Sequence, residues 1–185
     1  MWGARGMGMH RPVRPVGILW LGAATACAVV QLGAGAQPRA ASKLEPVSPA
    51  GLLQAVRRYR GKVVLLNVWA TTCGPCVAEL QELRRLDQEY LARGVQVVTF
   101  AMDPPEDRRR VEEFVREYTG KLPVLVRKPG NPEAFLKQID RQWRGMVPVT
   151  YVFDRRGRRA GKTLVGQQTF SAFVAAVQPA LGKRK

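Results

Sequence analysis

Residues Val63–Cys76 read VVLLNVWATTCGPC, and this stretch decides the fold of the chain. Its first half is an apolar run typical of a strand buried on both faces, and an amphipathic stretch begins at Val77. Two cysteines, separated by two residues, therefore stand where a strand ends and a helix begins. The unpaired N–H groups and the partial positive charge of a helix N-terminus stabilise a thiolate. We expect Cys73 to be the nucleophile and Cys76 to be the resolving thiol that closes a disulfide.

Two other uses of a Cys-X-X-Cys pair are disfavoured. A structural zinc site needs four ligands, and the chain offers only Cys27 and His10 besides the pair. Both of these lie in an N-terminal segment that has the pattern of a targeting signal. A purely structural disulfide across so short a loop would constrain the unfolded chain little and so contribute little stability. We therefore favour a redox role, and we expect no bound metal and no cofactor.

The chain is strongly basic, with 30 Lys+Arg against 14 Asp+Glu and a net charge of +16. Its 185 residues suffice for one domain plus an appendage, and 46% hydrophobic residues suit a globular core. Three basic residues and no acidic ones precede Gln37, so the remainder carries +13. Such a charge favours anionic lipid or acidic partners. No nucleic-acid recognition motif is present, so we expect no nucleic-acid partner and interpret the arginines mainly as a solvated surface.

We interpret residues 1–36 as a signal peptide or an N-terminal membrane anchor. A basic start precedes the uncharged apolar run 16–30, and residues 34–36 fit a signal-peptidase site. Because this run approaches the length of a membrane span, an uncleaved anchor stays open as an alternative, and Cys27 weakly resembles a lipoprotein box. Each alternative carries the domain beyond the cytoplasmic membrane, into the periplasm. Residues 37–47 are polar, contain two prolines and are expected to form a linker.

The remaining residues, 48–185, alternate between helix and strand patterns, without an internal repeat. The elements are expected, in chain order, at residues 49–59, 62–69, 77–92, 95–101, 106–118, 122–126, 132–139, 149–153, 160–165 and 169–180. The first two strands, joined by a helix, make a parallel βαβ unit, and a hairpin adds two antiparallel strands near the C-terminus. We therefore expect an α/β fold with a mixed central sheet and helices on both faces.

The segment from Trp69 to Cys76, taken with this order of elements, resembles the thioredoxin superfamily. It is most similar to the exported TlpA/ResA-like thiol-disulfide oxidoreductases, over residues 45–182. The resemblance implies a thioredoxin-like three-layer α/β/α sandwich, with Trp69 in the substrate-binding surface. Thr72 departs from the pattern, because many relatives have a second tryptophan there. The Gly-Pro dipeptide between the cysteines matches the most reducing branch of the superfamily.

Glu79 stands three residues after Cys76, where this family has a glutamate close to the cysteine pair. One helical turn separates the two residues, so they can share a face of the helix. Partial desolvation would raise the pKa of the Glu79 carboxyl and let it take or return the proton of Cys76. The alternative is a solvated glutamate that is favourable near a helix N-terminus.

Val147 and Pro148 precede the hairpin, where thioredoxin-like folds have a cis-proline that faces the cysteines. A cis bond would leave the Val147 backbone free to pair with an extended substrate segment, whereas the alternative is a trans-proline at a strand start. Trp143, which also resembles a subset of the family, would shield the disulfide, contact substrate or pack in the core. Asp103 lies in a loop at the same edge of the sheet, and Arg108–Arg110 are expected at the surface.

The resemblance implies a protein disulfide reductase that acts outside the cytoplasmic membrane. Its substrates would be disulfide-bearing proteins such as apocytochrome c or copper-site proteins, and a membrane thiol carrier of the CcdA/DsbD type would donate electrons. Two alternatives stay open: an oxidant that installs disulfides, and a metallochaperone that holds Cu(I) on the two thiolates, with Met146 as a third ligand. A peroxide-reducing role ranks last, because peroxidases of this superfamily use a different cysteine context.

Overall fold

A computed structural model describes residues 43–182 of the chain. The signal peptide or anchor predicted at residues 1–36, and the first residues of the predicted linker, lie outside this range. None of the helices within the range combines the length and the apolar character needed to cross a bilayer.

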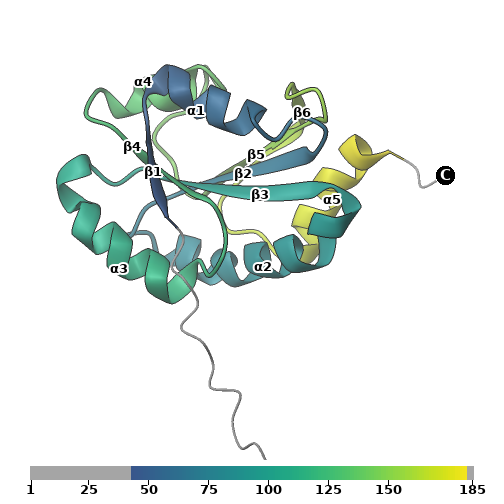
Figure 1. Cartoon of the computed structure of the whole chain (residues 1–185), viewed down its shortest axis with the longest axis horizontal. Coiled ribbons are helices and arrows are strands. Elements are labelled where there is room, and N and C mark those ends of the chain that lie inside the picture. The colour runs from purple at the N-terminus through teal and green to yellow at the C-terminus, as the bar shows by residue number, and fades with distance from the viewer. Residues whose placement is uncertain (1–42, 183–185) are drawn as a thin grey trace, which may run out of the picture. The chain divides into compact units, whose positions relative to one another are not determined.

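A six-stranded mixed sheet forms the centre of the described residues (Figure 1). Its strands are β1 (Leu44–Val47), β2 (Val63–Trp69), β3 (Val95–Ala101), β4 (Val124–Arg127), β5 (Val149–Phe153) and β6 (Arg159–Val165). Their order across the sheet is β1-β4-β3-β2-β5-β6. The first four strands in this order pair in parallel, whereas β5 pairs antiparallel with both β2 and β6. The βαβ unit and the hairpin expected from the sequence are both present.

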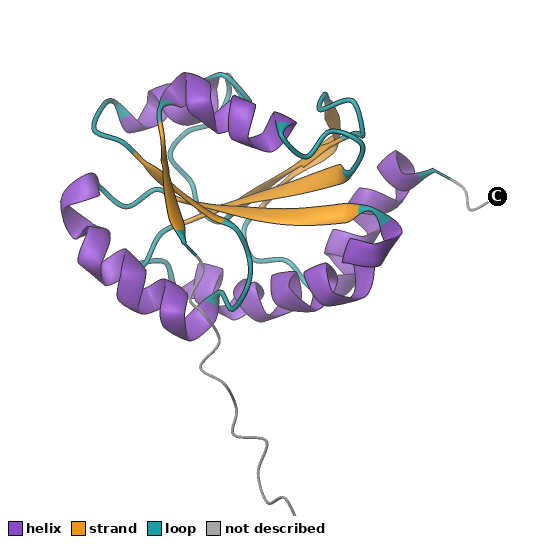
Figure 2. Ribbon diagram, in the orientation of Figure 1, coloured by secondary structure: helices purple, strands orange, loops and turns teal. Residues whose placement is uncertain are grey.

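Helices cover both faces of this sheet (Figure 2). They are α1 (Pro49–Arg57), α2 (Gly74–Tyr90), α3 (Arg108–Tyr118), α4 (Pro132–Lys137) and α5 (Phe170–Leu181), with the short 3-10 helices η1 (Leu91–Arg93) and η2 (Pro105–Asp107). In Figure 1, α1 and α4 lie on one face of the sheet, and α2, α3 and α5 lie on the other. This is the three-layer α/β/α sandwich that the resemblance implied.

The central strands β2 and β3 are buried along their whole length, because helices pack on both of their faces. Successive side chains of a strand point to opposite faces, and β2 follows this rule. Leu66 packs in one cluster with Leu52 of α1 and Phe135 of α4, whereas Leu65 packs in another with Leu83 of α2. The two central strands therefore form a rigid support for the loops that follow them.

The linker prediction for residues 37–47 is wrong in its last part, because Leu44–Val47 forms the edge strand β1. This strand pairs in parallel with Val124–Arg127 of β4. The strand was not predicted because it contains Pro46. Proline lacks an N–H donor and is tolerated in sheets mainly at edge strands, so it argues against a strand in the sequence. The helix predicted from residue 106 also differs, because α3 begins at Arg108 after a 3-10 turn.

Candidate active site

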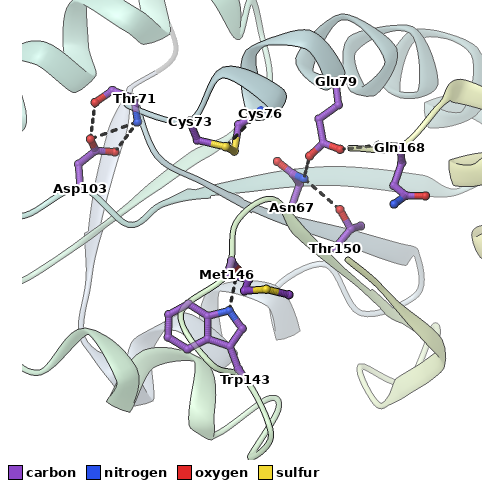
Figure 3. Close-up of a disulfide and its surroundings, with 10 residues drawn as sticks. All are labelled: Asn67, Thr71, Cys73, Cys76, Glu79, Asp103, Trp143, Met146, Thr150 and Gln168. Atoms are coloured by element: carbon purple, nitrogen blue, oxygen red, sulfur yellow. Dashed lines mark hydrogen bonds between the residues drawn. A yellow bond between two sulfur atoms is a disulfide. The ribbon is translucent and has the colours of Figure 1, made fainter. Parts of the chain in front are cut away.

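The cysteine pair lies at the N-terminus of α2, as the sequence predicted (Figure 3). Cys73 is the N-cap residue of this helix, and it forms a disulfide with Cys76 across a Cα–Cα distance of 5.3 Å. The backbone N–H of Cys76 donates a hydrogen bond to Cys73 Sγ at 3.2 Å. Cys76 is wholly buried, whereas Cys73 is half-buried and followed by the exposed Gly74 and Pro75. A reacting sulfur that approaches from solvent therefore meets Cys73 first.

Trp69 lies inside the core, which corrects its expected place in the substrate-binding surface. Its side chain is wholly buried and stacks on Phe114 of α3, with the ring centroids 4.6 Å apart. It belongs to the same apolar cluster as Cys76, and Cys73 packs against this cluster. The indole N–H is buried without a hydrogen-bond partner among the described residues. Trp69 thus supports the disulfide from the core rather than contacting a bound polypeptide.

Glu79 is a buried carboxyl one turn into α2, not a solvated helix residue. One carboxylate oxygen accepts from Asn67 Nδ2 at 2.6 Å, and the other accepts from the backbone N–H of Gln168 at 3.0 Å. Burial raises the pKa of Glu79 to about 7, although these two hydrogen bonds act in the opposite direction. The carboxyl therefore exchanges protons near neutral pH, as a general acid or base must.

Asn67 is a polar residue on the central strand β2 that the sequence reasoning did not assign to the site. Its side-chain amide donates to Glu79 and also to Thr150 Oγ1 at 3.0 Å, across the β2–β5 pair in which Asn67 faces Thr150. All three side chains are buried, and Figure 3 shows them on one side of the disulfide. The sequence did contain a signal for this role, namely a single asparagine within an otherwise apolar strand. A buried amide needs hydrogen-bond partners, so such a residue indicates other polar side chains beside it.

The loop before β5 contains a cis peptide bond between Val147 and Pro148, as the sequence predicted. In Figure 3 this loop rises from Met146 toward the disulfide before it descends to Thr150. Val147 packs against the apolar cluster that contains Cys76, and Cys73 packs against the same cluster. The carbonyl of Pro148 accepts from the N–H of Gly166 at 2.9 Å, which ties the loop to the end of β6.

Trp143 lies away from the disulfide, in the core cluster between the sheet and helices α1 and α4. It is 8% exposed, and its indole N–H donates to the carbonyl of Met146 at 2.9 Å. Figure 3 shows it on the far side of the Met146 backbone from the cysteines. Of the alternatives expected for Trp143, core packing is therefore the one that its position favours, and its indole also fixes the start of the Pro148 loop.

On the opposite side of the disulfide from Glu79, the buried carboxylate of Asp103 binds Thr71, two residues before Cys73 (Figure 3). The Thr71 hydroxyl also donates to Asp103, and it accepts from the guanidinium of Arg110, at 2.9 Å from Nε to Thr71 Oγ1. Arg110 was expected at the surface, and its side chain is 50% exposed, which confirms that expectation. Neither contact was predicted, because Thr71 and its two partners are far apart in the sequence.

This arrangement suits thiol–disulfide exchange. A half-buried Cys73 at a helix N-terminus offers an attacking sulfur, and the buried Cys76 can attack it in turn. The carboxyl of Glu79 titrates near neutral pH within the same helix. Among residues 43–182, no three His, Cys, Asp or Glu side chains gather in a way that could hold a metal ion.

A sandwich of this topology, with a cysteine pair that caps the helix after its central strand, defines the thioredoxin-like class of proteins. Residues 50–158 match the AhpC/TSA family, and the chain belongs to this family. The resemblance inferred from the cysteine motif and the element order is thereby confirmed.

Curated relatives of the chain include thiol-disulfide oxidoreductases. The protein named thiol-disulfide oxidoreductase ResA from a strain of Bacillus cereus is 33% identical over 114 residues, which cover 62% of this chain and 61% of that protein. Thioredoxin-like protein YneN from Bacillus subtilis (strain 168) is 30% identical over 108 residues, which cover 58% of this chain and 59% of that protein. The chain thus spans about three fifths of the length of these relatives.

Solved structures of the same fold come from Chlorobium tepidum. A thiol:disulfide interchange protein of the thioredoxin family from strain TLS aligns with a TM-score of 0.56 and 27% identity, over 68% of this chain and 83% of that one. A putative thiol:disulfide interchange protein DsbE aligns with a TM-score of 0.57 and 24% identity, over 68% of this chain and 84% of that one. The second likeness supports the fold alone.

Proposed function

We propose that this protein is a thiol–disulfide oxidoreductase that reduces disulfides in other proteins outside the cytoplasmic membrane. The observation that carries the proposal is the difference in burial between the two cysteines at the start of α2, with a titrating carboxyl one turn away. The names of the relatives, which are identical at about a third of the aligned residues, agree with this chemistry.

In the reduced protein, the thiolate of Cys73 attacks one sulfur of a target disulfide. A mixed disulfide forms, and the other target sulfur leaves as a thiolate that takes up a proton. Glu79 then accepts the proton of Cys76, directly or through water, because its pKa lies close to neutral pH. The Cys76 thiolate attacks Cys73, which releases the second target sulfur and closes the Cys73–Cys76 disulfide. Two electrons pass from the cysteine pair to the target.

The loop at Val147 and Pro148 is the proposed docking edge for the target. Val147 is half-buried beside the apolar cluster of Cys76, and Met146, the residue before it, is 57% exposed. An extended target segment would add its backbone to this edge, in the way that peptides add to exposed strand edges. Apocytochrome c or copper-site proteins are proposed targets, by the resemblance to the TlpA/ResA-like proteins.

The oxidised protein needs a source of electrons beyond the membrane, and a membrane thiol carrier of the CcdA/DsbD type is the proposed donor. The export that this requires rests on the signal-like sequence of residues 1–36, whether it is cleaved or kept as an anchor. Fractionation of cells that express the tagged full chain tests this part. Recovery of the protein with cytoplasmic markers would contradict it.

Replacement of each cysteine tests the chemistry. Cys73→Ser removes the attacking sulfur and should abolish reduction of a model protein disulfide such as that of insulin. Cys76→Ser keeps the attack but removes the release step, so it should accumulate mixed disulfides that dithiothreitol resolves. Cys27→Ser is the matched control, because this third cysteine lies in the predicted targeting segment, and it should leave the activity unchanged. Activity that survives Cys73→Ser would overturn the proposal.

A further inference from the structure

Hydrogen bonds connect the loop that follows β2 with the loop that follows β3, beside the cysteine pair. The backbone N–H of Met102 donates to the carbonyl of Trp69 at 2.8 Å. The carboxylate of Asp103 then accepts from the backbone N–H of Thr71, at 3.0 and 3.2 Å from its two oxygens, and from the Thr71 hydroxyl (Figure 3). The side chain of Asp103 is only 2% exposed. Both hydrogens of Thr71 that can be donated thus meet one buried carboxylate.

Two arginines from other elements hold Asp103. Arg110 of α3 donates from Nε to Thr71 Oγ1 at 2.9 Å, and its Nη2 lies 3.8 Å from the Asp103 carboxylate. Arg127 at the end of β4 donates from Nε to the backbone carbonyls of Met102 and Asp103, at 3.0 and 3.1 Å. The Thr71 hydroxyl thus donates one hydrogen bond, to Asp103, and accepts one, from Arg110.

This arrangement bears on Cys73 through the backbone. Thr71 is the second residue of the turn that runs from Ala70 to Cys73, and the N–H of Cys73 closes this turn on the Ala70 carbonyl at 3.1 Å. The same turn sets Cys73 at the N-cap of α2, where its sulfur accepts from the N–H of Cys76. A residue that fixes Thr71 therefore fixes the orientation of the attacking sulfur.

The arrangement also sets the local charge. A carboxylate near a thiol disfavours the thiolate, whereas a guanidinium favours it. Asp103 supplies a buried negative charge, and Arg110 supplies the positive charge that offsets it while it also pairs with Asp107. Among the described residues, Glu79 lies on the far side of the disulfide, and Arg127 directs its guanidinium to backbone carbonyls.

We propose that Asp103 and Arg110 are positioning residues for Cys73: they hold its turn through Thr71 and balance the charge beside its sulfur. The proposal rests on Cys73 as the attacking sulfur of the proposed function. It assigns opposite electrostatic effects to the two residues. Loss of Arg110 leaves the Asp103 charge unbalanced and makes the Cys73 thiolate harder to form, whereas loss of the Asp103 charge makes it easier to form.

The test measures the pKa of the Cys73 thiol in the reduced full chain, from the pH dependence of its alkylation by iodoacetamide. Mass spectrometry separates the peptide that contains Cys73 and Cys76 from that of Cys27, and fragment spectra assign the alkylated sulfur to Cys73 or Cys76. The guanidinium of Arg110 lies against Thr71, at 2.9 Å from Nε to Oγ1. Cys73 is two residues further on, at most ~7 Å along the chain, so the charge acts on the thiol from a distance on the order of 10 Å. At that separation, Arg110→Gln should raise the thiol pKa by about half a unit, and the alkylation rate below that pKa should fall about threefold.

Asp103→Asn should lower the pKa of the Cys73 thiol by a similar amount, and Arg110→Lys should restore the wild-type value. Arg109→Gln is the matched control, because its side chain is 91% exposed and pairs with Glu113, and it should leave the pKa unchanged. Thermal unfolding of each variant separates loss of stability from the change in the thiol.

Three results would overturn the proposal. The first is a thiol pKa in Arg110→Gln equal to that of the Arg109→Gln control, even if the variant is less stable. The second is a shift in the same direction for Arg110→Gln and Asp103→Asn, which would indicate general loosening of the loop. The third applies if Arg110→Gln fails to fold: it is a pKa of the Cys73 thiol in Asp103→Asn that is unchanged or raised relative to the wild-type protein. Disulfide reduction that persists in Cys73→Ser would instead refute the proposed function, whichever way these pKa values move.

Discussion

Glu79 gives the structure a pH-dependent stability that one isosteric substitution should remove. Its carboxyl is wholly buried, and burial raises its pKa from 4.5 to about 7. Between these two pH values the folded protein binds a proton that the unfolded chain does not. The unfolding free energy therefore falls as pH rises through this window, and the contribution of Glu79 is fully present below pH 4.5 and lost above pH 7.

The size of the effect follows from the two pKa values. One pKa unit corresponds to about 1.4 kcal/mol, so the Glu79 contribution should fall by about 2.5 kcal/mol between roughly pH 5 and pH 8. Glu79→Gln cannot titrate. The carboxylate of Glu79 accepts hydrogen bonds from both Asn67 Nδ2 and the Gln168 N–H. The amide of the substituted glutamine has only one acceptor, so its NH₂ group faces one of these two donors without a hydrogen bond. That mismatch costs stability equally at every pH, so it does not change the slope.

The assay is urea unfolding of the oxidised wild-type protein and of Glu79→Gln, at several pH values between about 5 and 8. The difference in unfolding free energy between the two proteins should fall steadily with rising pH. All other titrating groups are common to both proteins and cancel in this difference. A difference that stays constant within about 0.5 kcal/mol would refute the reasoning, because it would mean that Glu79 titrates alike in the folded and unfolded states.

Two further substitutions test the neighbours of this carboxyl and of the disulfide. Asn67→Ala removes a hydrogen bond that lowers the pKa of Glu79, so the fall in stability should move to higher pH in the same urea series. Trp69→Phe keeps an aromatic ring to stack on Phe114 and removes an indole N–H that has no partner among the described residues. It should cost only about 1 kcal/mol of unfolding free energy, against about 3–5 kcal/mol for Trp69→Ala.

The sequence predicts best those elements whose residues are all buried, because their apolar side chains form a nearly unbroken run. Strand β3 is apolar along most of its length and occupies Val95–Ala101, the range predicted for it. The position of the cysteine pair was predicted correctly for a related reason. The buried strand β2 before it and the amphipathic helix α2 after it are both clear in the sequence, and only a short loop separates them. The edge strand β1 was missed, because its four residues include Pro46 and have no repeating pattern to detect.

The candidate site is predictable only where chemistry is local in the sequence. Glu79 and the cysteines share one helical turn or two, so their proximity follows from helix geometry. The bond between Thr71 and Asp103 joins residues 32 positions apart, and it depends on how β2 and β3 end side by side. Trp69 was assigned to the surface by resemblance, whereas the ring of Phe114 from α3 covers it.

The reduction potential of the Cys73–Cys76 disulfide tests the central claim most directly. The purified full chain would be equilibrated with dithiothreitol or glutathione buffers, and the fraction of the reduced pair would be measured by alkylation. The account predicts a potential near that of thioredoxin, about −270 mV, because a reductant must hold its electrons less tightly than its targets do. A potential near that of DsbA, about −120 mV, would contradict it and would make the protein an oxidant that installs disulfides.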